Sequence, residues 1–459
     1  MATSNHPITA GGIPRAQGVS RALPALAVLL LLAVGIATVA YRYPPPDMGV
    51  LVAGGAALGG VLALALTRYD AAVALGFLLL GVVNVEPAPP DAVFAVVIAV
   101  AAVTGRFDLT HVPFAILASL GAFLTFNVLS VMEAIEPSTA AVFLSITLYL
   151  SVFSVWLAGY VTSFRRARLV VMAYLAAAVF SAVVGSLAYF VAFPGSESLL
   201  FGAGEATGQR VKGLFDDANV FAPFMVPIAL ILLEETLQPR LIRLRRGLKI
   251  ALLLILMLGV VLAFSRAAYL NLAVGVLVLL VVLTLRTGGG AKAGALLAIL
   301  VMAGGMIAAI LTFTGQDEFL TKRAQVQRYD TSRFGAQRTG IELAEKHPLG
   351  VGPGQFDVIS PVSTHSTYIR TLAEQGFAGF LAFFALAAIT LLLAIRNAAR
   401  GNHTYGIGSA ALLAAWCGLL VNSLVIDSAH WRHLWVVAAL IWAGSMTMER
   451  QRSQRVDRG

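Results

Sequence analysis

Long apolar runs, separated by short polar segments, repeat along nearly the whole chain. Most runs are about 20 residues long, the length at which a helix crosses the hydrocarbon core of a bilayer. They predict helices over residues 22–41, 48–67, 70–84, 91–104, 112–131, 139–161, 169–193, 219–237, 248–264, 267–285, 293–314, 367–395, 406–426 and 434–448. The predicted fold class is therefore an all-α polytopic membrane protein.

Two of the runs, 70–84 and 91–104, are shorter than the roughly 17 residues that a full span needs. If both cross the membrane, the bundle has 14 transmembrane helices; if they form tilted or re-entrant elements, it has 12. The bundle carries one sizeable water-facing segment, residues 315–366.

Composition changes this picture little. Of the 459 residues, 59% are hydrophobic and 12% are charged, about half the charge of an ordinary soluble domain. The net charge of +9 comes from short basic clusters between the apolar runs, so we predict no nucleic-acid partner. The single cysteine, Cys417, excludes a disulfide within the chain and a cysteine-based metal site.

The positive charges predict the orientation. With a cytoplasmic N-terminus, the inside segments hold 20 Lys and Arg, whereas the short outside loops hold five: Arg42, Arg210, Lys212, Arg266 and Arg432. This asymmetry follows the positive-inside rule and predicts that both termini are cytoplasmic. The first run exceeds the about 7–15 apolar residues of a signal peptide, so we interpret it as a retained span.

Arg210 and Arg266 stand out because they are predicted on the outer side against the charge bias. A guanidinium grips a phosphate through two parallel hydrogen bonds, so two of them on one face suit a lipid-linked diphosphate. Alternatively, each side chain extends to lipid headgroups or pairs with Asp216 or Asp217. Either interpretation places both arginines at the membrane boundary.

The water-facing segment contains a predicted surface helix and a turn. Residues 332–346 place Phe334, Arg338 and Ile341 along one helical stripe, which suits a helix on the membrane or over the bundle. The Gly/Pro sequence at 350–354 then predicts a tight turn. A plain turn is the favoured interpretation, and presentation of its N–H groups to an anion is the alternative.

His365 follows at the mouth of the apolar helix that begins near residue 367. A histidine there can take a proton from a sugar hydroxyl near neutral pH, provided that its surroundings keep it neutral. In the structural alternative, Thr364 or Ser363 caps the helix and His365 is merely adjacent.

Taken together, these motifs resemble the bacterial O-antigen ligase and polymerase superfamily. The resemblance is strongest over about 330–385 and is supported by 208–224 and 262–270. It rests on Ser332-Arg333-Phe334, on Glu345-Lys346-His347-Pro348-Leu349-Gly350-Val351-Gly352-Pro353-Gly354-Gln355-Phe356, on His365-Ser366-Thr367-Tyr368 and on Glu374-Gln375-Gly376-Phe377-Ala378-Gly379. It implies a multi-spanning bundle of the metal-independent, lipid-donor glycosyltransferase type.

The resemblance also implies an activity: transfer of a glycan from undecaprenyl diphosphate to an acceptor hydroxyl. In ligases the acceptor is the lipid A core, and in polymerases it is another lipid-linked repeat unit. The family's loop histidine corresponds to His365, and its two diphosphate-binding arginines correspond to Arg210 and Arg266. The physical chemistry gives compatible roles, a general base and cations on the leaving group. Lys212 and Arg338 complete the predicted substrate-binding set.

Two positions depart from the family pattern. Ser366 stands where an Asn often follows the histidine, and Ala218 stands where a Pro often precedes Asn219, so ligase and polymerase both stay open. Asp216 and Asp217 are interpreted as partners of Lys212 or as the cap of the helix at Asn219, not as metal ligands. We predict an inverting transfer that needs no metal and no other cofactor.

The predicted organisation has five parts, in the inner (cytoplasmic) membrane of a bacterium. A disordered cytoplasmic N-terminus, 1–21, precedes a transmembrane bundle, 22–314; a periplasmic loop domain, 315–366, precedes the C-terminal transmembrane helices, 367–448, and a cytoplasmic tail, 449–459. The predicted partners are the undecaprenyl-diphosphate-linked donor, the glycan acceptor and membrane lipids.

Two other classes compete with the enzyme. A transporter or lipid-linked glycan flippase needs more ionisable groups within the spans than this chain has. A non-catalytic subunit of a polysaccharide assembly machine needs the arginines and His365 only for structure. Convergence of Arg210, Arg266 and His365 on one outward-facing site separates the enzyme from both.

Overall fold

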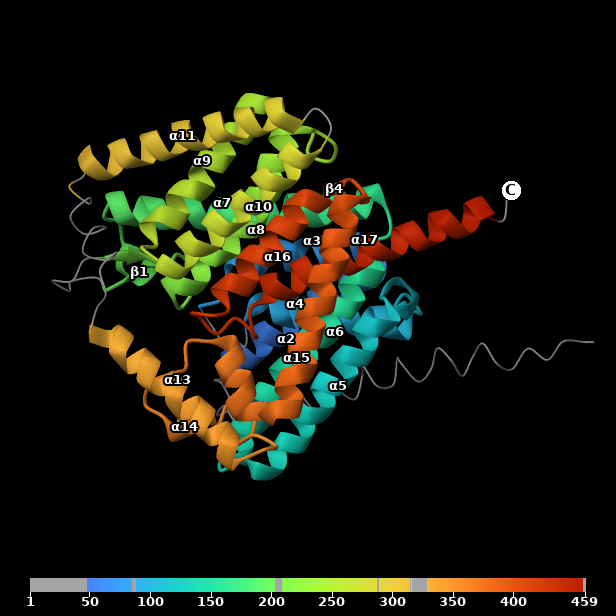
Figure 1. Ribbon diagram of the computed structural model, residues 1–459, viewed down its shortest axis with the longest axis vertical. Coiled ribbons are helices and arrows are strands. Elements are labelled where there is room, and N and C mark those ends of the chain that lie inside the picture. The colour runs from blue at the N-terminus through green and yellow to red at the C-terminus, as the bar shows by residue number, and fades with distance from the viewer. Residues whose placement is uncertain are drawn as a thin grey trace, which may run out of the picture.

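The computed structural model describes residues 48–84, 88–202, 209–286, 289–313, 315 and 328–456 (Figure 1). The predicted disordered N-terminus, 1–21, and the first predicted span, 22–41, lie outside the described residues. So do residues 316–327 of the predicted periplasmic loop domain.

Helices make up most of the described chain, which confirms the all-α prediction. They are α2 (Met48–Thr67), α3 (Tyr69–Leu78), α4 (Pro89–Val103), α5 (Phe114–Ser130), α6 (Pro137–Tyr160), α7 (Phe164–Phe190), α8 (Ala218–Leu237), α9 (Arg246–Leu262), α10 (Arg266–Leu285), α11 (Gly289–Phe313), α13 (Arg328–Lys346), α14 (Phe356–Ile359), α15 (Thr367–Ala399), α16 (Ser409–Asn422) and α17 (Arg432–Val456). The strands form two short antiparallel pairs, β1 (Leu200–Phe201) with β2 (Arg210–Val211) and β3 (His403–Thr404) with β4 (Ile407–Gly408).

Six helices among the described residues are long and apolar enough to cross a membrane: α5 with the short helix that continues it to Glu133, α6, α7, α8, α10 and α15. Five shorter apolar helices accompany them, over Val52–Thr67, Tyr69–Gly81, Pro89–Val103, Gly290–Val301 and Ser409–Asn422. The chain is therefore a multi-pass membrane protein, as predicted. The total of 12 or 14 spans stays a prediction.

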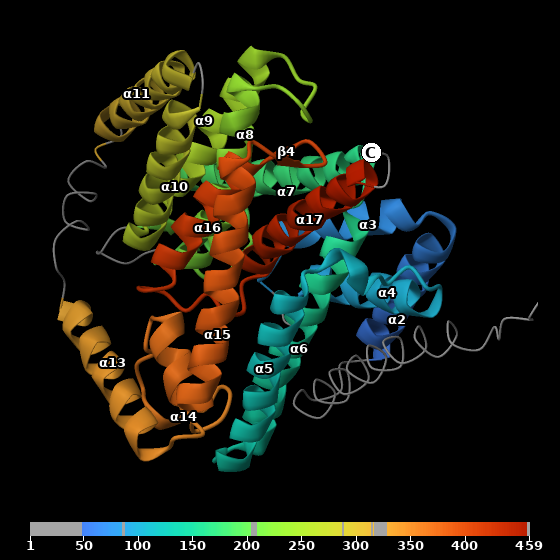
Figure 2. The ribbon, with the colours of Figure 1, turned by 45° about the vertical axis from the view of Figure 1, so that its right-hand side comes forward.

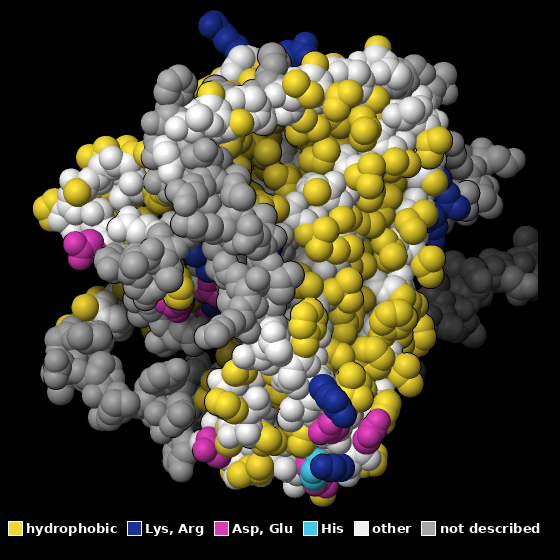
Figure 3. All heavy atoms as spheres, turned by 60° about the vertical axis from the view of Figure 1, so that its left-hand side comes forward, with side chains coloured by type: hydrophobic (Ala, Val, Ile, Leu, Met, Phe, Trp, Pro, Cys, Tyr) yellow, Lys and Arg dark blue, Asp and Glu magenta, His cyan; other side chains and the backbone are white. Residues whose placement is uncertain are grey.

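The surface of α15 shows how the bundle meets lipid. Phe377, Leu381, Phe384, Leu392 and Ile395 are exposed, and their spacing of three, four and eight residues places them on one face of the helix. A broad band of hydrophobic side chains covers one side of the molecule, with charged side chains gathered at its lower end (Figure 3). Such a continuous apolar surface suits a bilayer and not water.

Helix α8 lies at the centre of the bundle. In its candidate span 89% of the residues are buried, and it contacts α9, α10 and α16. A helix that is apolar all round is stable where protein surrounds it on every side.

The C-terminal ends of α8, α10 and α15 meet. Arg286 follows α10, and its Nη1 lies 3.9 Å from Oε1 of the buried Glu234 near the end of α8. Its Nη2 donates a hydrogen bond of 3.1 Å to the carbonyl of Ala398 at the end of α15. The charge pattern predicts that the segments after these three helix ends lie on the cytoplasmic side of the membrane. Because the three C-termini meet there, the three N-termini lie toward the opposite face.

Helix α15 is broken two turns from its start. Gly376 has φ 67° and ψ −175°, which interrupts the helical hydrogen bonds. The freed carbonyls of Ala373 and Glu374 accept hydrogen bonds of 3.0 Å from the N–H groups of Val351 and Gly352. The predicted Gly/Pro turn therefore supplies hydrogen-bond donors to the broken helix. Because the N–H groups of Val351 and Gly352 are used in these bonds, they do not bind an anion.

Helix α13 packs against the first turns of α15, and both views show it beside α14 (Figure 2). Its inner face carries small residues, because Ala336, Gly340 and Ala344 are buried. A Cβ atom at Gly340 would lie 2.6 Å from Cγ2 of Ile369 and 3.6 Å from Cγ2 of Thr364. The predicted surface helix thus covers the segment that contains His365.

Candidate functional site

Arg210 is held at the start of α8 and α10 by a short chain of hydrogen bonds. It lies on β2 and is 8% exposed. Its Nε donates to the carbonyl of Ala263 at 2.9 Å, and its Nη2 donates to Oδ1 of Asn219 at 2.8 Å. Oγ of Ser265 donates to the same Asn219 oxygen at 2.9 Å. The guanidinium is therefore fixed between the first turn of α8 and the residue that caps α10.

Arg266 is the first residue of α10 and is half-buried. It follows Ser265 directly, so the chain of hydrogen bonds from Arg210 through Asn219 ends beside it. The structure thus brings the two predicted arginines to one place. Lys212 is half-buried two residues after Arg210, in the turn whose N–H groups bond to the carbonyl of Leu199.

Helix N-termini add positive potential to these cations. Asp217 caps α8, because its Oδ1 accepts a hydrogen bond of 2.8 Å from the N–H of Asn219. This confirms the cap that the sequence predicts. Ser265 caps α10. Two helices therefore begin at the arginines, and their aligned peptide dipoles favour an anion there.

His365 is held in a left-handed backbone conformation with φ 46°, which few residues other than glycine adopt. Its neighbours fix this bend: Oγ1 of Thr364 donates to the carbonyl of Ser366 at 3.1 Å and accepts from its N–H at 3.4 Å. The cap of α15 is Ser366, whose Oγ accepts from the N–H of Ile369 at 3.5 Å. The alternative in which Thr364 or Ser363 caps this helix is therefore wrong.

The environment of His365 favours the neutral imidazole. Burial lowers the pKa of His365 below its ordinary value, and the nearby charge of Arg333 lowers it further. Asp217, Asp427 and Asp357 act in the opposite direction with smaller effects. Asp217, the first of these carboxylates, is the cap of α8 beside Arg210. A half-buried neutral histidine of this kind can accept a proton.

Arg338 does not join these residues. Its side chain is 84% exposed on α13, and its Nε lies 3.1 Å from Oε1 of Glu342 one turn along the helix. Arg333 is half-buried on the same helix and acts on His365. The sequence holds a signal for this difference, since the buried Ala336 and Gly340 mark the inner face of α13 and Arg333 precedes them at helical spacing.

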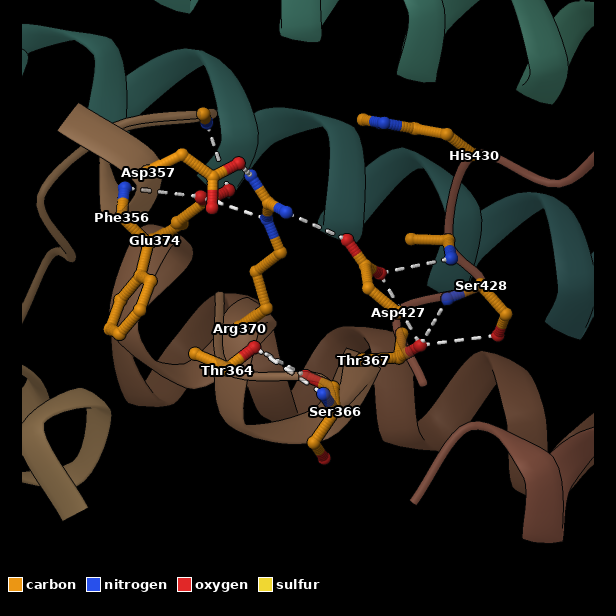
Figure 4. A network of polar contacts seen from close by, with 12 residues as sticks. Phe356, Asp357, Thr364, Ser366, Thr367, Arg370, Glu374, Asp427, Ser428 and His430 are labelled. Carbon is orange, nitrogen blue, oxygen red and sulfur yellow. Dashed lines mark hydrogen bonds and ion pairs between the residues drawn. The ribbon is translucent and has the colours of Figure 1, made fainter. Parts of the chain in front are cut away.

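Next to His365 in the chain lies a polar network that sequence reasoning missed, buried except for the exposed Asp357 (Figure 4). Arg370 of α15 uses all three of its guanidinium nitrogens: Nη2 lies 2.6 Å from Asp357, Nη1 lies 3.0 Å from Asp427, and Nε lies 3.0 Å from Glu374. Glu374 also accepts hydrogen bonds from the N–H groups of Gly354 and Phe356. The network joins α15 to the turn at 350–356 and to the loop between α16 and α17.

That loop also holds the start of α15. The N–H of Thr367 donates to the carbonyl of Ser423 at 2.9 Å, and Oγ1 of Thr367 accepts from the N–H of Ser428 at 2.8 Å. Figure 4 shows Thr367 pointing toward Asp427 and Ser428 from the first turn of the helix. His365 is two residues away, so the loop 423–431 fixes the backbone that carries it.

Metal ligands are sparse in the part of the chain that the structure describes, where no group of three or more His, Cys, Asp or Glu side chains could hold a metal ion. Asp357, Glu374 and Asp427 surround Arg370 instead. Independence from metal stays a prediction.

Residues 250–384 match the family model described as O-antigen ligase. The matched segment includes Arg266, Arg333, His365, Arg370 and Glu374. A comparison with curated proteins finds no match.

Proposed function

We propose that the chain transfers a glycan from undecaprenyl diphosphate to an acceptor hydroxyl, and the match of residues 250–384 to the O-antigen ligase family model supports this proposal. The reaction takes place at the periplasmic face of the bacterial inner membrane, with both chain termini in the cytoplasm. The acceptor is the lipid A core, as in O-antigen ligases, or a second lipid-linked repeat unit, as in polymerases.

The donor diphosphate binds where Arg210 and Arg266 meet the first turns of α8 and α10. Two guanidinium groups and two helix N-termini there oppose the two phosphates. Lys212 adds a third cation beside them. Arg338 points into water and pairs with Glu342, so we assign it no contact with the diphosphate.

The chemical step follows from this placement. The acceptor hydroxyl gives its proton to the neutral imidazole of His365, and its oxygen forms a bond to the anomeric carbon of the donor. The bond from that carbon to the phosphate oxygen breaks, and its electron pair stays with the diphosphate. The arginines offset the charge that develops on this leaving group. In-line attack inverts the configuration of the anomeric carbon and requires no metal.

One observation carries this proposal: Arg210, Asn219 and Ser265 form one hydrogen-bonded cluster at two helix N-termini, with Arg266 directly after Ser265, while burial favours the neutral form of His365 at the start of a third helix. A flippase or a structural subunit does not need a neutral histidine beside a paired arginine site. The geometry therefore favours the enzyme.

The test is transfer in vitro with purified protein in EDTA. The donor is undecaprenyl-diphosphate-linked glycan, given with lipid A core in one arm and alone in the other. We expect product from the wild type and from the controls His347→Ala and Arg243→Ala, and none from His365→Ala or Arg266→Ala. The acceptor that is consumed distinguishes ligase from polymerase. Full activity of His365→Ala and Arg266→Ala would reject the site, and absence of wild-type transfer in both arms would reject the function.

A further inference from the structure

Three arginines gather where α3 meets α4, α6 and α7 (Figure 2). Arg106 lies in the turn after α4, and Arg165 and Arg166 lie in the first turn of α7. All three reach the start of α3, where they contact Tyr69 or Asp70. The proposed glycosyl transfer uses none of these residues, so their arrangement needs its own explanation.

The start of α7 shows on which face the arginines lie. A Cβ atom at Gly406 would lie 3.0 Å from Cε2 of Phe164, so the first residue of α7 packs against the turn between β3 and β4. This turn connects α15 to α16, and the end of α15 meets the ends of α8 and α10. The other end of α7 leads to β1, which pairs with the strand of Arg210. The three arginines are therefore on the face opposite the proposed diphosphate site.

Tyrosine rings hold two of the guanidinium groups in place. Cζ of Arg106 lies 5.0 Å from the ring centre of Tyr69. Cζ of Arg166 lies 4.8 Å from the ring centre of Tyr160, and its Nη1 donates a hydrogen bond of 3.1 Å to Oγ1 of Thr162. The two rings are neighbours, with 6.0 Å between their centres. Because these contacts already orient the guanidinium groups, less side-chain entropy is lost when the groups bind a ligand.

Anions do not balance these cations. Arg165 forms an ion pair with Asp70, and Nε of Arg166 lies 3.8 Å from the same carboxylate. The Arg165 side chain is nevertheless 80% exposed. Within the described residues, the guanidinium of the exposed Arg106 has no hydrogen bond or ion pair and contacts only the ring of Tyr69. The cluster therefore keeps donors that an anion from outside the chain can use.

The surroundings of the cluster are basic and apolar. Residues 68–70, 104–111 and 161–168 together hold five arginines and two aspartates, a net charge of +3 with the histidine neutral. Val103 at the end of α4 is 71% exposed, and Leu66 near the end of α2 is 58% exposed. Exposed apolar side chains at helix ends suit contact with lipid, so the arginines lie at the level of the headgroups. Basic residues between membrane helices on the cytoplasmic side bind anionic headgroups.

We propose that Arg106, Arg165 and Arg166 bind the phosphate group of an anionic phospholipid, in the leaflet opposite the proposed diphosphate site. The phosphate oxygens accept hydrogen bonds from the guanidinium groups, and the acyl chains lie along the exposed apolar side chains of α2 and α4. Inorganic phosphate offers the same acceptors without the acyl chains. The lipid site is independent of the proposed glycosyl transfer, and its occupancy needs no turnover.

The experiment compares Arg106→Gln with Arg243→Gln in detergent, by native mass spectrometry during titration with phosphatidylglycerol. Arg243 is a matched control: it is exposed in the segment between α8 and α9, which the charge pattern predicts on the same side, and its guanidinium has no hydrogen bond or ion pair within the described residues. Both substitutions remove one positive charge. A second arm uses zwitterionic phosphatidylethanolamine, and a third adds inorganic phosphate as a competitor at constant ionic strength. Arg165→Gln is tested in parallel, so that the result does not depend on one variant being recovered folded.

For Arg106→Gln we expect the Kd for phosphatidylglycerol to rise about fivefold, which corresponds to about 1 kcal/mol for one basic residue near an anionic lipid. Arg165→Gln should have a similar effect, whereas Arg243→Gln should stay within about twofold of the wild type. Equal losses in Arg106→Gln and Arg243→Gln would show that the lipid responds only to overall charge. Equal affinity for phosphatidylethanolamine, or displacement of the lipid by inorganic phosphate, would show that the cluster does not select an anionic lipid. Each of these results overturns the inference, and none of them bears on glycosyl transfer.

Discussion

Replacement of Asn219 by alanine tests whether the arginine cluster acts as a unit. Oδ1 of Asn219 accepts one hydrogen bond from the Arg210 guanidinium and one from the Ser265 hydroxyl. A hydrogen bond to a charged group contributes about 1.5–3 kcal/mol and a neutral one about 0.5–1.5 kcal/mol. Asn219→Ala therefore removes about 1.5–3 kcal/mol that holds Arg210 in place, and about 0.5–1.5 kcal/mol that holds Ser265.

We expect part of this loss to appear in catalysis, because Arg210 keeps its bond to the carbonyl of Ala263 but can turn away from the diphosphate. A loss of 1.4–2.8 kcal/mol corresponds to a fall in kcat/KM of about 10- to 100-fold. The assay is transfer with purified Asn219→Ala, with Asn127→Ala as the control for removal of a buried asparagine.

The double variant Arg210→Ala with Asn219→Ala completes a thermodynamic cycle. If Asn219 acts through Arg210, the double variant is about as active as Arg210→Ala alone, because the two losses are not additive. Losses that add in full, or a fully active Asn219→Ala, would refute the reasoning that the cluster positions Arg210.

Three further predictions concern the rest of the site. Arg370→Leu leaves three carboxylates without their shared cation, so we expect unfolding to become easier by about 3–5 kcal/mol and the Tm in detergent to fall, whereas an unchanged Tm would contradict the buried network. Because burial and Arg333 lower the pKa of His365, kcat/KM should be full at neutral pH and fall as the pH drops through that lowered pKa. Arg333→Gln removes the positive charge, so the fall should begin at a higher pH. An unchanged pH profile would show that Arg333 does not act on His365. Gly376→Ala should destabilise the fold, because a Cβ there would lie 2.1 Å from the carbonyl of Pro348 at φ 67°, and a folded variant with the wild-type Tm would refute the break in α15.

Much of the fold follows from local patterns. The length of each apolar run predicts the helices, since a membrane span needs about 20 apolar residues whatever its neighbours are. Arg210 and Arg266 are visible in the sequence because they oppose the charge bias of the outer loops. The break at Gly376 is not visible as such, because it depends on N–H groups supplied by a turn some 25 residues earlier.

The remaining site residues required the tertiary structure. Asp427 lies 57 residues from Arg370 and reaches it through the loop after α16, and no periodicity in the sequence marks such a pair. Arg333 and Arg338 share one helix, and the packing of Gly340 against Ile369 shows which of the two turns inward. The spacing of small residues on α13 contains that information, whereas the stripe of Phe334, Arg338 and Ile341 marks the exposed face.

The central claim is that His365 performs the chemistry while the arginines bind the donor. Its most direct test measures donor binding and single-turnover transfer on the same preparations of wild type, His365→Ala and Arg266→Ala. The account predicts that His365→Ala binds undecaprenyl-diphosphate-linked glycan as tightly as the wild type but does not transfer it, and that Arg266→Ala binds it at least about tenfold more weakly. Rapid transfer by His365→Ala, or wild-type donor binding by Arg266→Ala, would contradict this division of roles.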